Sequence, residues 1–199
     1  MSKGFHSLDA VCVAAYARGD MTEGERLEAV LDQLDDILAD DEGVTAARAN
    51  IAGVSAWYAS RGMPVFPLSA NSKVPMKGTH GLLDATVDPA IARRMIPDGY
   101  RANLAVATGH THDVIDVDGP EGHHSVIRQL KADPDFPRVF GIGLTPRGMH
   151  FWVAPTGRGN TTAMLPSVDY RGMGGYVVVP PSVVDDSPYR WLMPPGTTA

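Results

Sequence analysis

Two aspartates two residues apart, at the end of a run of β-branched residues, constrain this chain more than any other feature. Asp116 and Asp118 lie in the segment Val114-Ile-Asp-Val-Asp118, which a glycine and a proline follow. In a β-strand, side chains two residues apart project from the same face, about 6.5 to 7 Å apart along the strand. We therefore expect a strand over residues 114–118 that presents both carboxylates together.

The two carboxylates favour a divalent metal site, although aspartates at strand ends also serve as turn formers. Asp118-Gly119-Pro120 fits such a turn. Asp116 lies before it, inside an apolar run, where an unpaired carboxylate is costly and a cationic group should meet it. Because the two carboxylates repel each other, we also expect that removing either one leaves the stability of the fold unchanged or raises it.

Further polar residues lie inside two later β-like segments. His150 lies in Gly148-Met-His-Phe-Trp-Val153, and Asp169 lies in Val168-Asp-Tyr-Arg171. Arg171 follows Asp169 by two positions, so both side chains should project from one strand face. An Asp-x-Asp pair followed by a histidine and a third aspartate is the pattern of a nucleotidyltransferase site.

Several segments between residues 56 and 182 carry a resemblance to a known family. They are residues 56–68, 73–75, 80–89, 102–109, 114–118, 145–150 and 168–182. In this order they resemble the bifunctional primase-polymerase domain of the archaeo-eukaryotic primase superfamily, found in plasmid and phage replication proteins. Arg147-Gly148 stand where that family often has a serine and a second glycine. The first 50 residues lie outside the resemblance.

The resemblance implies a role for each site residue. Asp116 and Asp118 would be paired ligands of two Mg²⁺ or Mn²⁺ ions, and Asp169 would complete the metal site from another strand. Carboxylates suit both metals, and two ions can stabilise the attacking and leaving oxygens of a phosphoryl transfer. His150 would contact the incoming nucleoside triphosphate.

Other polar residues have two readings each. Arg171 is a candidate for binding the triphosphate, because guanidinium pairs bidentately with phosphate, or it forms an ion pair that balances Asp169. Lys73 is a candidate contact to phosphate or template, or a solvated cation. His110, His112 and Asp113 are close in sequence but complete no metal-site pattern, so no metal is assigned to them.

The expected function is template-dependent nucleotide transfer, as a DNA primase or DNA-directed polymerase that synthesises or extends primers. Single-stranded DNA template and nucleoside triphosphates are the expected partners, together with a helicase domain or protein after the chain. A metal-dependent nuclease is the alternative enzyme, because it also uses clustered acids and a histidine. A nucleic-acid-binding replication module without catalysis is the third possibility, disfavoured because all three acids and the histidine are present.

The net charge of −6 divides unevenly along the chain. Residues 1–50 carry four basic and eleven acidic side chains, whereas residues 51–199 carry thirteen basic and twelve acidic ones. A net charge near zero in the second part permits a basic groove for the phosphate backbone. The acidic first part contacts a partner, shields that groove or is a solvated helical face, and the sequence favours the last.

Short apolar strands between Gly and Pro turns, with helices expected near residues 89–95 and 122–132, indicate an α+β or α/β fold. The resemblance implies the α+β class, with a primase-like core in which a mostly antiparallel sheet carries the acids. Residues 1–44 should form an acidic helical extension, with a capping box at Thr22 and Glu25, and residues 45–199 the catalytic domain. Thr45 is expected to cap a helix that runs toward Ser60. One cysteine, no signal peptide and no long apolar run indicate a cytoplasmic protein without a membrane segment.

Overall fold

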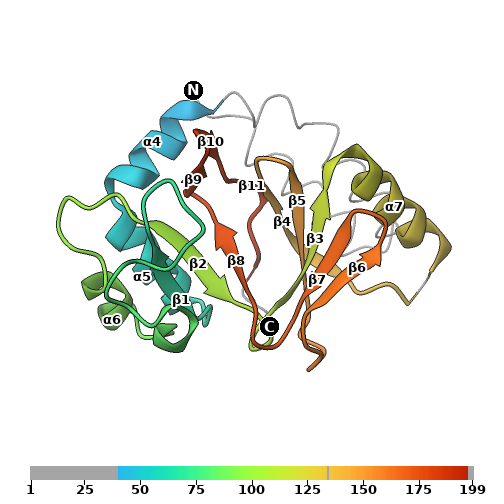
Figure 1. Ribbon diagram of the computed structural model, residues 1–199, viewed down its shortest axis with the longest axis horizontal. Helices are drawn as coiled ribbons and strands as arrows, with labels where there is room; N and C mark the ends of the chain where they lie inside the picture. Colours follow the sequence, from blue (N-terminus) through green and yellow to red (C-terminus); the bar gives the residue numbers. More distant parts are fainter. Residues whose placement is uncertain (1–39, 134, 197–199) are drawn as a thin grey trace.

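The computed structural model describes residues 40–133 and 135–196, which form two antiparallel sheets and a set of short helices (Figure 1). One sheet has three strands in the order β1-β2-β8, and the other has six in the order β11-β4-β5-β3-β7-β6. This arrangement confirms the predicted α+β class with a mostly antiparallel sheet. The predicted helices before residue 40 lie outside the described residues. No helix within the described residues is long and apolar enough to cross a membrane.

Short strands alternate with Gly- and Pro-containing turns throughout. The three-stranded sheet consists of β1 (Val65–Leu68), β2 (Asn103–Ala107) and β8 (Tyr176–Val179). The six-stranded sheet consists of β3 (Asp113–Asp118), β4 (Val139–Leu144), β5 (Gly148–Val153), β6 (Thr161–Leu165), β7 (Val168–Arg171) and β11 (Arg190–Met193). A two-residue ladder joins β9 (Val183–Val184) to β10 (Ser187–Pro188).

The helices lie on the outer sides of the two sheets (Figure 1). They are α4 (Asp41–Ala49), α5 (Ile51–Ser60), α6 (Pro89–Arg94) and α7 (Gly119–Ala132), with a 3₁₀ turn, η1 (Gly81–Asp84). The helices that the sequence predicts near residues 89–95 and 122–132 are confirmed as α6 and α7. Helix α7 begins directly after β3, with a proline in its first turn, where the missing N–H is not needed.

The expected cap at Thr45 is wrong, because α4 begins four residues earlier. The carboxylate of Asp40 accepts a hydrogen bond of 3.1 Å from the backbone N–H of Gly43 and so caps the helix. Arg190 of β11 donates to the Asp40 carbonyl and to the Asp41 carboxylate. The predicted boundary after residue 44 therefore falls inside a helix whose first turn is tied to the six-stranded sheet.

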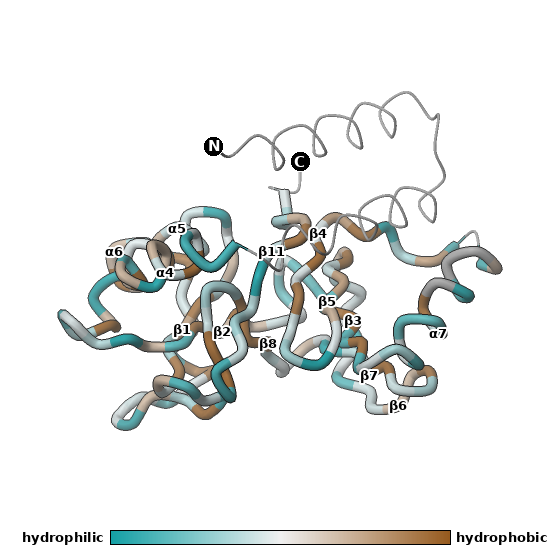
Figure 2. Tube along the Cα trace, turned by 90° about the horizontal axis from the view of Figure 1, so that it is seen from above, coloured by the Kyte–Doolittle hydropathy of each residue, from teal (hydrophilic) through white to brown (hydrophobic). Residues whose placement is uncertain are grey.

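Both faces of the six-stranded sheet are packed against other elements. Side chains along β3 project alternately to the two faces and enter a different core on each. Ile115 and Val117 face α7 and share a core with its Val126. Val114 faces the other way and joins Trp152 in a second core with residues of the three-stranded sheet. Figure 2, seen from above, shows the two sheets in separate halves of the molecule. Asp116 and Asp118 share the face of Val114, so they lie on the side of the sheet that faces the other half.

His112 lies inside this second core, although it neighbours the exposed His110. It is only 2% exposed, and its ring centroid lies 5.2 Å from that of Phe140 and 5.4 Å from that of Trp152. Its Nδ1 is 2.8 Å from Oγ1 of Thr111, whereas its buried Nε2 has no hydrogen-bond partner among the described residues. Burial therefore lowers the pKa of His112 to about 4, although Asp113 opposes the shift.

The lowered pKa of His112 predicts a pH-dependent stability. The unfolded chain binds a proton near pH 6.5 and the folded chain only near pH 4, so the free energy of unfolding is highest above pH 6.5. It should fall by roughly 2 to 3 kcal/mol as the pH drops from 7 to 4. Urea unfolding across this range measures the loss. His112→Phe should flatten the profile between these values and His110→Gln should not; equal profiles for all three proteins would contradict the prediction.

Candidate active site

The register of the six-stranded sheet aligns five residues in one row across five strands. Trp191 of β11 is opposite Gly143 of β4, and Gly143 is opposite His150 of β5. His150 is opposite Asp116 of β3, which in turn is opposite Asp169 of β7. Because directly opposite residues project from the same face, the predicted histidine and two of the predicted acids lie side by side. Asp118, two residues further along β3, shares this face.

Arg171 is the cation that the burial of Asp116 requires. Its Nη2 lies 3.2 Å from Oδ2 of Asp116 and 2.8 Å from Oδ2 of Asp169, so one guanidinium bridges two carboxylates. The sequence proposed either an ion pair with Asp169 or a contact to triphosphate for this residue. The ion pair is present in the structure, and it extends to Asp116 as well.

His150 meets Asp116 from the other side. Its Nε2 is 3.4 Å from Oδ1 of Asp116, and its side chain is 8% exposed. Burial by itself would raise the pKa of Asp116, but the hydrogen bond and charge of His150 and the charge of Arg171 outweigh it and lower the pKa to about 2. Asp116 is thus held as a carboxylate between two donors.

The other two acids are held differently. The backbone N–H of Ala163 donates a 2.9 Å hydrogen bond to Oδ1 of Asp169, which leaves Oδ2 turned toward Arg171. Asp118 is half-exposed and pairs at 3.4 Å with Nη2 of Arg147, a more exposed side chain from the turn between β4 and β5. Each carboxylate therefore has an arginine as its counterion.

The oxygens of the three carboxylates suit a hard divalent cation, but each carboxylate is already paired with an arginine side chain. Within residues 40–133 and 135–196, no group of three His, Cys, Asp or Glu side chains is gathered closely enough to hold a metal ion. The guanidinium of Arg171 pairs with both Asp116 and Asp169 and supplies one positive charge there, where a divalent ion would supply two. Oxygen ligands of this kind are those that Mg²⁺ and Mn²⁺ prefer. The residues fit such an ion if Arg171 turns aside.

Lys73 lies apart from this group in an exposed loop after β1. Its backbone carbonyl accepts a 3.2 Å hydrogen bond from the hydroxyl of Tyr176 in β8. Among the described residues, no hydrogen bond or ion pair joins the Lys73 side chain to the carboxylates. The structure therefore brings together five of the six predicted site residues and leaves Lys73 at a distance.

Two residues at the site were not singled out from the sequence. Arg147 was noted only as a departure from the family pattern, and its contact with Asp118 depends on the fold of the β4–β5 turn. Gly148 allows β5 to approach β3 beside Asp118, because a Cβ atom there would lie 1.9 Å from the carbonyl oxygen of Val117. The only sequence signal for either is its position just before the motif histidine.

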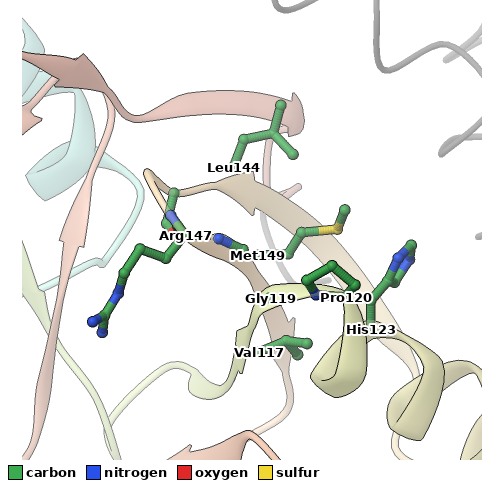
Figure 3. A pocket seen from close by; sticks show the side chains of 9 residues that line it. Val117, Gly119, Pro120, His123, Leu144, Arg147 and Met149 are labelled. Atoms are coloured by element: carbon green, nitrogen blue, oxygen red, sulfur yellow. Dashed lines mark hydrogen bonds between the residues drawn. The ribbon is translucent and has the colours of Figure 1, made fainter.

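A cavity of about 310 Å³ lies on the opposite face, between the start of α7 and the β4–β5 turn. Leu144, Met149 and Pro120 surround it, and the Arg147 side chain extends away from it (Figure 3). Val117 and Met149 belong to the core that packs against α7. The cavity is therefore separated from the carboxylates by the sheet itself.

The chain matches a known protein family over most of its length. Residues 55–199 match the family described as bifunctional DNA primase/polymerase, N-terminal (Prim-Pol). The match spans every strand and includes the row of site residues. No curated protein matches the chain.

For Asp116, the geometry favours the opposite of the expectation that loss of a carboxylate leaves stability unchanged or raises it. Because His150 and Arg171 stabilise the ionised form of Asp116, Asp116→Asn should lower the free energy of unfolding at pH 7 by roughly 1 to 2 kcal/mol. Asp98→Asn, in an exposed loop, is the matched control and should change it by less than about 0.5 kcal/mol. Urea unfolding without divalent metal measures both. A more stable Asp116→Asn protein would contradict this prediction and would indicate that repulsion between the carboxylates dominates.

Proposed function

The chain belongs to the bifunctional DNA primase/polymerase family, and on this basis we propose that it synthesises or extends primers on a single-stranded DNA template from nucleoside triphosphates. Membership supports a nucleotidyltransferase of the primase/polymerase type in general. The row formed by His150, Asp116 and Asp169 carries the more specific proposal, because it joins the three motif residues on one sheet face. Asp118 adds a second carboxylate from the same strand.

Asp116, Asp118 and Asp169 would hold two Mg²⁺ or Mn²⁺ ions. The family is in general dependent on divalent metal ions, and three carboxylates on one face supply oxygen ligands of the preferred kind. When bound, two such ions stabilise the attacking 3′-hydroxyl oxygen and the leaving pyrophosphate oxygen. The rigid antiparallel ladder of β3 and β7 keeps Asp116 and Asp169 in position for this role.

In this proposal, the Arg171 guanidinium would release the two carboxylates and bind phosphate instead. In the structure it neutralises Asp116 and Asp169, which lie on the face where like charges would otherwise repel. If Asp116 and Asp169 held a metal ion, they would no longer need Arg171 as their counterion. Arg171 could then donate to the oxygens of a bound triphosphate, which guanidinium binds bidentately.

His150 would bind the triphosphate from the other side of Asp116. The ring is nearly buried and Asp116 fixes its orientation through Nε2. An imidazole held in this way loses little conformational freedom on binding its substrate. We assign it to the nucleotide and not to the template, because it lies in the row of carboxylates.

Loss of either β3 carboxylate should abolish nucleotide incorporation. We expect Asp116→Asn and Asp118→Asn to lower the rate of primer extension with Mg²⁺ or Mn²⁺ at least about 100-fold, because each would remove a metal ligand. Asp98→Asn serves again as the control and should retain full activity. Labelled nucleotide incorporation on a primed template is the measurement. Near wild-type activity of either site variant would contradict the assignment of that aspartate as a metal ligand.

The same assay separates polymerisation from the nuclease alternative. A polymerase lengthens the labelled primer and leaves an unprimed oligonucleotide intact, whereas a nuclease shortens both. Shortening that requires Asp116, without any incorporation, would replace the proposed function.

Replacement of His150 should affect the nucleotide more than the template. His150→Ala is expected to raise the KM for the nucleotide by about tenfold or more, the loss typical of a hydrogen bond to a charged group. Binding of single-stranded template in a gel-shift assay should stay within about twofold. The exposed His124→Ala is the control, and an equal loss of template binding in His150→Ala would assign this histidine to the template.

A further inference from the structure

Tyr189 lies beside the row of site residues, although no motif includes it. It directly precedes β11, and only 2% of the residue is exposed. Its ring centroid is 6.0 Å from that of His150, with the two rings inclined by 46°. Tyr189 also belongs to a hydrophobic core that includes Phe66 and Val184. Tyr189 thus forms part of the wall next to the motif histidine.

The segment that carries Tyr189 leads into the strand that begins the row. Gly143 stands between Trp191 and His150 in the row, and a Cβ atom there would lie 3.3 Å from the Trp191 ring and 3.8 Å from Cβ of His150. Tyr189 precedes Trp191 by two residues, and its ring lies next to that of His150.

The hydroxyl of Tyr189 differs from those of the other described tyrosines. The hydroxyls of Tyr58, Tyr100, Tyr170 and Tyr176 all take part in hydrogen bonds within the protein. That of Tyr189 makes none with the described residues, yet it is not among the buried polar atoms that lack a partner. The residue is therefore almost fully enclosed, and its hydroxyl oxygen keeps only a small accessible area.

Most of the charged groups that act on this hydroxyl belong to the site. Burial first and then Asp116 raise the pKa of Tyr189 to about 12, with Asp118 and Asp185 acting in the same direction and Arg147 against it. The phenol consequently stays protonated at neutral pH, and it can donate its proton to an anionic acceptor. Negatively charged phosphate oxygens are such acceptors.

We propose that the Tyr189 hydroxyl donates a hydrogen bond to a phosphate oxygen of the nucleotide that His150 and Arg171 bind, a role that rests on the proposed function. The hydroxyl has no hydrogen-bond partner among the described residues, its ring neighbours that of His150, and Asp116 and Arg147 act on it electrostatically. A core aromatic that only supports His150 would need the ring but not the oxygen. The two roles are therefore separable by removing the oxygen alone.

Tyr189→Phe removes the oxygen and keeps the ring. We expect the KM for the nucleotide in primer extension to rise about tenfold, the loss typical of a hydrogen bond to a charged acceptor, with kcat within about twofold. Inorganic triphosphate, used as a competitive inhibitor, should bind more weakly by a similar factor. Tyr170→Phe removes a hydroxyl that donates to the buried Asp113 on the opposite face. That control should lose stability without a change in KM.

Each other outcome has a definite meaning. An unchanged KM in Tyr189→Phe would overturn the proposal while wild-type incorporation kept the proposed function intact. A raised KM with unchanged inhibition by triphosphate would assign the hydroxyl to the sugar or base, which also overturns it. Absence of incorporation by the wild-type protein would instead reject the proposed function on which the inference rests.

A second measurement does not depend on whether the Tyr189→Phe protein folds. 3-Fluorotyrosine placed at position 189 of the full chain reports on the environment of the hydroxyl by ¹⁹F NMR. Inorganic triphosphate with Mg²⁺ should shift this resonance, and His150→Ala should weaken the titration. A resonance that stays unshifted at saturating triphosphate would overturn the proposal.

Discussion

The bridge from Arg171 to Asp116 and Asp169 is the interaction on which the site depends. It allows two carboxylates to lie directly opposite each other on neighbouring strands, where their charges would otherwise repel. His150 supports the same arrangement from the other side of Asp116. A carboxylate in this position is costly to bury alone and favourable when it is paired. The sheet can therefore carry concentrated negative charge on a face that is otherwise part of the packed interior.

Features with a local cause could be predicted from the sequence. The alternation around Asp116 predicted both the strand and the common face of its two aspartates, because a period of two depends only on the backbone. The burial argument predicted a cation near Asp116, and the spacing of Asp169 and Arg171 placed that cation on the correct face. The α+β class followed from short strands mixed with few helices.

Features that depend on distant parts of the chain were missed. Thr45 was a reasonable cap in isolation, but Arg190, almost at the other end of the chain, fixes Asp40 and Asp41 at the start of α4. Likewise, the contact of Arg147 with Asp118 needs the β4–β5 turn, and that of Tyr189 with His150 needs the pairing of β11, β4 and β5. The pairing of strands decides these contacts, and no local pattern encodes it.

The row from Trp191 to Asp169 also bears on how such a chain can vary. Each member reaches the common face only because its strand is in a fixed register with the next, and a shift of one residue turns a strand's side chains to the opposite face. A single insertion or deletion within β5 or β7 would point His150 or Asp169 toward α7, even with every motif residue retained. We therefore expect variation in length to be confined to the connections, such as residues 135–138 and 154–160. Related chains should differ in loop length far more than in the number of residues inside these strands.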